Sequence, residues 1–134
     1  MSSGPAALNR ELRAHLRRLA AWSILGGIAG LVIIGVRADP AGHAFGGWTA
    51  GWCAVNLLIV LASWRGRPPQ DRRRFREFLM LNEGLNLGYV GVGVALALAA
   101  VGPDVRAAGT AIAVQGFALF VLDTWLLRRV PIDG

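Results

Sequence analysis

Polar side chains interrupt one long apolar stretch of the chain within two helical turns: Asn82, Glu83, Asn86 and Tyr89. At about 100° per residue, Asn82, Asn86 and Tyr89 fall within an arc of roughly 60° on a helix. Ionisable side chains are costly in an apolar segment of membrane-spanning length, and such a residue is a functional hypothesis by default. The carboxyl group of Glu83, close to amides and a phenol, has the chemistry to share a proton, bind a cation or recognise a polar ligand.

Other apolar stretches carry polar residues at matching heights. Asn56 lies eight residues before the end of its stretch and Asn86 lies seven after the start of its own. Both should therefore lie about 10–12 Å deep, and we expect them to meet. The same counting puts Asp123 level with Glu83, at about 6 Å. The expected ligand-binding set includes an aromatic wall and the deeper Gln115, and comprises Trp52, Asn56, Asn82, Glu83, Asn86, Tyr89, Gln115 and Asp123.

Two interpretations of this set stay open. In the first, the groups line a pocket that opens toward the cytoplasmic leaflet, where Glu83 and Asp123 share a proton or bind a cation. In the second, the amides tie helices together by hydrogen bonds worth about 1 kcal/mol each. The two carboxylates would then reach Arg76 or Arg128 near the membrane surface. The two interpretations differ in whether these polar residues bind a ligand.

The elements that position these residues follow from hydropathy. Hydrophobic residues make up 54% of the 134-residue chain and charged residues 16%, and the mean hydropathy is +0.49. A hydrocarbon core of about 30 Å needs a helix of about 20 residues, and open strands cannot cross it with unpaired backbone groups. Four apolar stretches predict such spans, the first being short unless Leu16 and Leu19 extend it, over residues 20–36, 45–64, 79–101 and 107–127.

Short connections between these stretches predict an all-α, up-down four-helix bundle that is integral to a membrane. Residues that break helices lie in all three connections: Pro40 and Gly42, Pro68 and Pro69, and Gly102 and Pro103. Because each connection is short, sequential helices must run antiparallel.

Basic residues mark the expected cytoplasmic side. All fourteen are arginines, and twelve of them lie before the first span, between the second and third, or after the fourth. Basic flanks stay cytoplasmic, so this distribution predicts an N-in, C-in topology. The same charge would hold anionic lipid headgroups, and its position argues against a nucleic-acid partner. The residues expected to contact those headgroups are Arg17, Arg18, Arg72, Arg73, Arg74, Arg128 and Arg129.

A basic amphipathic arm is predicted over residues 1–19, on the cytoplasmic side, ahead of a single transmembrane domain over residues 20–134. Leu8, Leu12, Leu16 and Leu19 recur at helical spacing, with arginines mostly on the other faces. The arm either lies at the headgroup level before it turns into the first span, or continues that span as a helical extension.

Small residues predict where helices touch, because close packing supplies the attraction between helices in lipid. Such residues are, in the four stretches in turn, Ser23, Gly26, Gly27 and Gly30; Gly47, Gly51 and Ala54; Gly84, Gly88, Gly91 and Ala95; and Gly109, Ala113 and Gly116. In the third stretch Gly84, Gly88 and Gly91 form a row. That glycine row faces nearly opposite to the polar residues of the same helix. With two faces turned away from lipid, the helix of residues 79–101 is expected at the centre of the bundle.

Catalysis finds little support in the sequence, and we expect neither an enzyme nor a bound cofactor or metal. His15 and His43 fall on opposite sides of the predicted membrane, so they cannot share a metal ion or a haem. Cys53 has no candidate base nearby, and no serine has a His–Asp partner.

Two segments carry a resemblance to a known family. The third stretch reads Leu-Asn-Glu-Gly-Leu-Asn-Leu-Gly-Tyr from Leu81 to Tyr89, and Trp52 is followed by Cys-Ala-Val and Asn56. This pattern, Trp-x3-Asn with Leu-Asn-x-Gly-Leu-Asn/Asp-x-x-Tyr, resembles an uncharacterised family of small four-span bacterial membrane proteins. The resemblance implies four helices and a bacterial cytoplasmic membrane, and brings no activity. It also implies that an acid is usual in the family where this chain has Asn86.

Two function classes follow. The favoured one is a non-enzymatic membrane protein that acts by association. It would be an accessory subunit of a membrane complex, with a membrane-protein partner or copies of itself, or a binder of a lipid-like molecule in a polar pocket. The alternative is a small proton- or ion-coupled transporter that uses Glu83 and Asp123. Membrane lipids with anionic headgroups are expected partners in both.

Overall fold

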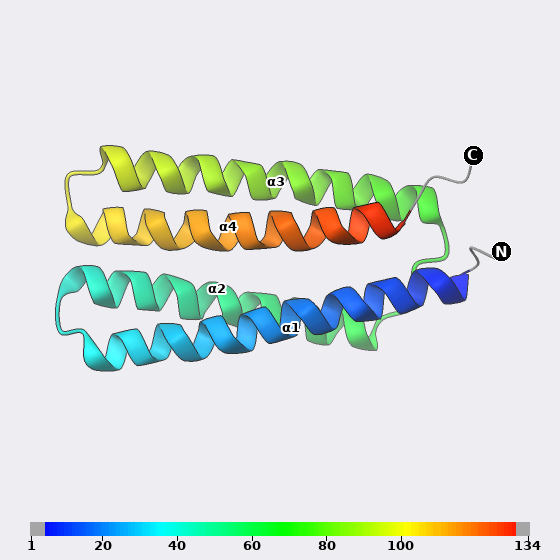
Figure 1. The fold of residues 1–134 in the computed structure, drawn as a ribbon, viewed down its shortest axis with the longest axis horizontal. Coiled ribbons are helices and arrows are strands. Elements are labelled where there is room, and N and C mark those ends of the chain that lie inside the picture. Colours follow the sequence, from blue (N-terminus) through cyan, green and yellow to red (C-terminus); the bar gives the residue numbers. More distant parts are fainter. Residues whose placement is uncertain (1–4, 131–134) are drawn as a thin grey trace.

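Four helices make up the computed structural model, which describes residues 5–130. They are α1 (Pro5–Val36), α2 (Pro40–Arg65), α3 (Arg72–Ala99) and α4 (Pro103–Arg129), and residues 5–130 contain no strand. Figure 1 shows two antiparallel hairpins side by side, α1 with α2 and α3 with α4, so that α1 begins at the same end at which α4 finishes. All four helices are long and apolar enough to cross a membrane, as predicted. The predicted arm and domain also include residues 1–4 and 131–134, which lie outside the described residues.

The helices begin where acidic and proline residues favour a start. Asp39 caps α2 by accepting a hydrogen bond from the Gly42 N–H at 3.0 Å, and Pro40 takes the first helical position. The Arg37 guanidinium, 2.6 Å from the Asp39 carboxylate, lowers the pKa of Asp39 to about 2, so the cap stays charged at neutral pH. Asp71 caps α3 in the same way through the Arg74 N–H.

The predicted arm belongs to the first helix. α1 runs from Pro5 to Val36 without interruption, which is the second of the two arrangements considered, a helical extension of the first span. Leu8, Leu16 and Leu19 are buried, and Leu8 packs in a cluster with Leu79, Leu126 and Val130. This cluster joins α1, α3 and α4 at the arginine-rich end of the bundle.

The central helix is α4, and the expectation that the third helix lies at the centre is wrong. α4 packs on α3 and α2 and also touches α1, whereas α3 packs chiefly on α4. The buried residues of α3 are Leu79, Asn86 and Gly93, spaced by seven, so α3 has one narrow packed strip. Its row of Gly84, Gly88 and Gly91 faces open space, since a Cβ built there would meet nothing within 4 Å.

Close helix contacts are confirmed at predicted glycines of α1 and α4. A Cβ on Gly109 of α4 would lie 2.6 Å from the Leu96 Cβ and 2.7 Å from the Gly93 carbonyl oxygen of α3. A Cβ on Gly30 of α1 would lie 2.7 Å from the Gly46 carbonyl oxygen of α2. The predicted contacts at Gly47 and Gly51 are absent from the described residues, because that face of α2 also looks into open space. Small residues therefore mark backbone-to-backbone approach only within each hairpin.

Candidate functional site: a polar cleft between α2 and α3

A cleft of about 300 Å³ lies between α2 and α3. Among residues 5–130 these two helices show no close backbone packing, although they follow each other in the chain. Apolar side chains form the two walls, and several are about half exposed: Val55 and Ile59 on α2 at 55% and 50%, Phe78 and Leu85 on α3 at 55% and 49%. The cleft therefore opens to the side of the bundle, between α2 and α3.

An aromatic pair forms the deep end of the cleft. Trp52 and Tyr89 meet edge to face with ring centroids 4.9 Å apart, and both line the cleft. Ser63 and Phe75 line it near the arginine-rich end of the bundle. At 1.5 Å per residue the cleft runs for about 15–20 Å along the helices, which suits an extended chain.

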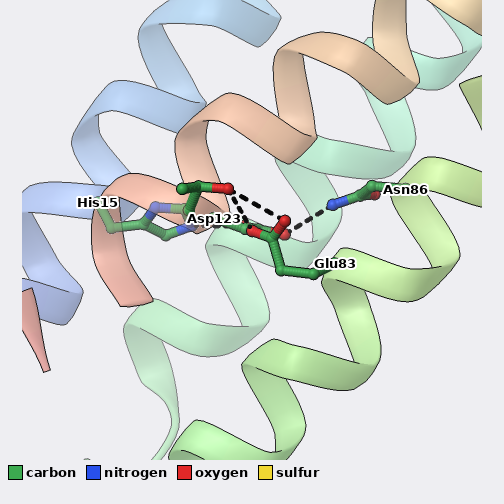
Figure 2. A network of polar contacts seen from close by, with 5 residues as sticks. His15, Glu83, Asn86 and Asp123 are labelled. Atoms are coloured by element: carbon green, nitrogen blue, oxygen red, sulfur yellow. Dashed lines mark hydrogen bonds and ion pairs between the residues drawn. The ribbon is translucent and has the colours of Figure 1, made fainter. Parts of the chain in front are cut away.

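The floor of the cleft is a buried polar chain drawn from three helices. His15 of α1 places its Nε2 atom 3.3 Å from one carboxylate oxygen of Asp123 on α4. The Asn86 amide of α3 donates to the other carboxylate oxygen at 2.9 Å. Figure 2 shows the side chains of His15 and Asn86 on either side of Asp123. Each of these residues is at least nine-tenths buried.

Sequence reasoning did not select His15 for this site. The residue shares a helical face with the buried Leu8 and Leu19, at spacings of seven and four. That placement was the available indication that its ring points inward and not toward the headgroups.

Two buried polar atoms on the cleft lining lack a partner within the part of the chain that the structure describes. They are the Nδ2 atom of Asn56 and the Nδ1 atom of His15, on side chains whose residues are only 3% and 6% exposed. A buried polar group left unpaired costs about 1–3 kcal/mol. The expected meeting of Asn56 with Asn86 does not account for them, because Asn86 turns to Asp123 on α4.

Glu83 lies outside the cleft. Its carboxylate accepts from the Thr124 hydroxyl at 3.0 Å for each oxygen, on a half-buried part of the contact between α3 and α4. Figure 2 shows this pair beside the Asp123 chain. In residues 5–130 neither Glu83 nor Asp123 pairs with an arginine. Arg76 instead donates to the carbonyls of Leu127 and Val130, at the C-terminal end of α4.

Gln115 also lies outside the cleft, and it ties helices together. Its side-chain oxygen accepts from the Trp22 indole at 3.0 Å and faces the Cys53 sulfur at 4.0 Å. At this height α1 and α2 are closely packed, since a Cβ on Gly26 would lie 2.8 Å from the Cys53 sulfur. Of the predicted set, the cleft therefore brings together Trp52, Asn56, Asn82, Asn86, Tyr89 and Asp123.

The arginines predicted to contact lipid headgroups lie around the end of the bundle where the cleft begins. Two lie against aromatic rings on other helices: the Arg17 guanidinium is 5.9 Å from the Trp64 ring and that of Arg18 is 4.2 Å from the Trp125 ring. Arg13 also stacks on Trp64, at 4.7 Å. Two more pair with neighbouring acids, Arg73 with Glu77 and Arg74 with Asp71. No arginine among the described residues lines the cleft.

Comparison with known proteins places the chain in a family. A family model described as a family of unknown function (DUF6992) matches residues 18–124. The match takes in the cleft residues from Trp52 to Asp123 and stops short of His15. No curated protein and no solved structure matches the chain. The chain therefore belongs to this uncharacterised family.

Proposed function

We propose that this member of the DUF6992 family is a non-enzymatic membrane protein that holds a lipid-like amphiphile in the cleft between α2 and α3. One observation carries the proposal: the cleft joins apolar walls that open sideways to a buried floor with unpartnered polar atoms. Ligand sites combine mostly apolar linings with a few placed polar groups in this way.

We further propose that the protein spans a bacterial inner membrane with both ends on the cytoplasmic side. The twelve arginines of the flanks and the inner connection support this orientation, because basic flanks stay cytoplasmic. The cleft then lies in the cytoplasmic half of the bilayer, and a lipid can reach it sideways without crossing the membrane. Arginines at its open end would contact anionic headgroups of the surrounding lipid.

Helix-to-helix hydrogen bonding alone explains the cleft poorly. Gln115 has the geometry of such a tie, with its oxygen facing donors on two other helices. Asn56 differs, because its amide nitrogen is buried and unpartnered among the described residues and it lies on the cleft lining. A residue retained only to join helices would be expected to pair with one.

A tryptophan placed in the cleft tests the proposal. In Ile59→Trp the indole fills the space between α2 and α3, and overpacking costs of about 1–3 kcal/mol should lower bound lipid by about tenfold or more. The readout is native mass spectrometry of protein released with its own membrane lipids, where the wild type should carry a discrete added mass. Leu58→Trp is the matched control, since Leu58 is the adjacent residue, is 65% exposed and is not on the cleft lining. An added mass that persists in Ile59→Trp at the level of the wild type and of Leu58→Trp would contradict the proposal.

Association with another membrane protein or a second copy is a second candidate function. The observation in its favour is the α3 row of Gly84, Gly88 and Gly91, which has nothing against it within 4 Å. Such rows let a partner helix approach closely in lipid. The same mass measurement distinguishes this function, because it would give a stable larger assembly that Gly88→Leu dissociates.

Proton- or ion-coupled transport has weaker support. The pairing of His15 with Asp123 places an acid and a base together in a buried site. Glu83, the second carboxylate of that hypothesis, is held by Thr124 away from the cleft. Transport would require that Glu83→Gln with Asp123→Asn abolish a pH-dependent flux in proteoliposomes.

A further inference from the structure

We infer that the cleft selects a neutral lipid with a hydroxyl head, in preference to lipids with acidic or ether heads. This rests on the proposed function, because it concerns the molecule that the same cleft holds. Two properties of the cleft floor carry it, its hydrogen-bonding capacity and its charge.

The unpartnered atoms of the floor are one donor and one acceptor. The Asn56 Nδ2 atom carries two N–H groups and can only donate. The His15 Nε2 atom faces a carboxylate oxygen at 3.3 Å, so the proton of a neutral ring sits on Nε2 and Nδ1 is left as an acceptor. A hydroxyl group donates and accepts, so one hydroxyl can donate to His15 Nδ1 and accept from Asn56 Nδ2. A carboxylate, phosphate, ester or ether only accepts, and an ammonium only donates.

The charge around the floor also disfavours an acidic head. Asp123 is the one carboxylate on the cleft lining, and none of the lining residues is an arginine. An anion beside Asp123 would meet a like charge in an apolar surrounding without a counter-ion. Two arginines of α1, Arg13 and Arg17, are stacked on Trp64. If an acidic lipid placed its head among those arginines, its apolar chain would lie against the polar floor and leave the polar atoms there unpaired.

The apolar walls determine how much of the lipid, beyond its head, the cleft can hold. A cleft of about 300 Å³ is at the lower end of the range of ligand pockets, so it takes one chain rather than a whole two-chain phospholipid. The head would sit on the floor, near Asn56 and His15, and the chain would lie between the α2 and α3 walls.

A series of probes with one chain length tests this. Tetradecanol, tetradecanoic acid and tetradecyl methyl ether are titrated into delipidated full-length protein in detergent at pH 7.5, and bound fractions are read by native mass spectrometry. The alcohol should bind about tenfold more tightly than the acid and the ether, because each of these leaves the His15 acceptor unpaired. In Asn56→Leu the affinity for the alcohol should fall to about that of the ether. The wild-type series needs no variant, so it decides even if Asn56→Leu does not fold.

The outcomes separate this inference from the proposed function. If the acid or the ether binds as tightly as the alcohol and Ile59→Trp abolishes that binding, the hydroxyl preference is overturned and the proposed function stands. If none of the three binds the wild type, or Ile59→Trp binds them all as the wild type does, both are overturned. A preference for the alcohol that Ile59→Trp removes supports both.

Discussion

Leucine at Gly109 is expected to destabilise the bundle severely, whereas leucine at Gly88 should leave it unchanged. Gly109 lies where α4 meets α3, and even a Cβ there would sit 2.6 Å from the Leu96 Cβ and 2.7 Å from two backbone atoms of α3. The larger side chain must push the two helices apart, at a cost of about 3 kcal/mol or more. The free energy of unfolding, measured by circular dichroism during transfer from a mild detergent into SDS, gives the value.

Gly88→Leu is the matched control for this experiment. Gly88 is also mid-helix and within the same hairpin, yet its added Cβ meets nothing within 4 Å. Because the substitution adds the same atoms to a helix in the same hairpin, the difference between the two variants isolates the close approach of α3 and α4. Equal destabilisation by both variants would show that the outward glycine row packs inside the bundle after all.

Leucine at Asp123 is the second substitution expected to have a large effect. It removes the acceptor shared by His15 Nε2 and Asn86 Nδ2, and leaves two buried donors unpaired. At about 1–3 kcal/mol for each unpaired group, the loss should be about 2–6 kcal/mol in the same unfolding assay. Asp123→Asn should lose less, because its amide oxygen still accepts one bond.

Thr124→Val supplies the comparison for Asp123. It removes the hydroxyl that donates to Glu83 at the adjacent position of α4, where the site is only half-buried. We expect a loss of about 1 kcal/mol or less there. If Asp123→Leu costs no more than Thr124→Val, the buried polar chain does not hold the floor of the cleft together.

The four helices could be predicted from the sequence because lipid restricts what a segment can do. Each apolar stretch had to be a helix, and the prolines at 40, 68–69 and 103 lie where the helices begin or separate. Gly42, also predicted to lie in a connection, is inside α2. The heights of Asn56, Asn86 and Asp123 also followed, because rise per residue is fixed in a helix. All three line the same cleft.

Which helix faces which could not be read from one sequence. Residue periodicity identified two special faces on α3 but could not say which meets a neighbour within this chain. The polar face packs on α4, and the glycine row of Gly84, Gly88 and Gly91 does not pack. The connection 66–71 leaves α2 and α3 apart, so Asn56 and Asn86 share a cleft and not a hydrogen bond. Gln115 shows the same limit of a single sequence. Its depth along the helix could be counted, but its neighbours, Trp22 and Cys53, could not be predicted.

The central claim is that a lipid chain occupies the cleft between α2 and α3, and photolabelling tests it most directly. Native membranes would be loaded with a fatty alcohol that carries a diazirine in its chain, irradiated, and the labelled residues mapped by peptide sequencing. We predict labels concentrated on Val55, Ile59, Phe78 and Leu85, with few on Leu58 and Leu87, which are 65% and 54% exposed but do not line the cleft. Equal labelling of both groups would contradict the claim, because it is what bulk lipid around an unoccupied bundle would give.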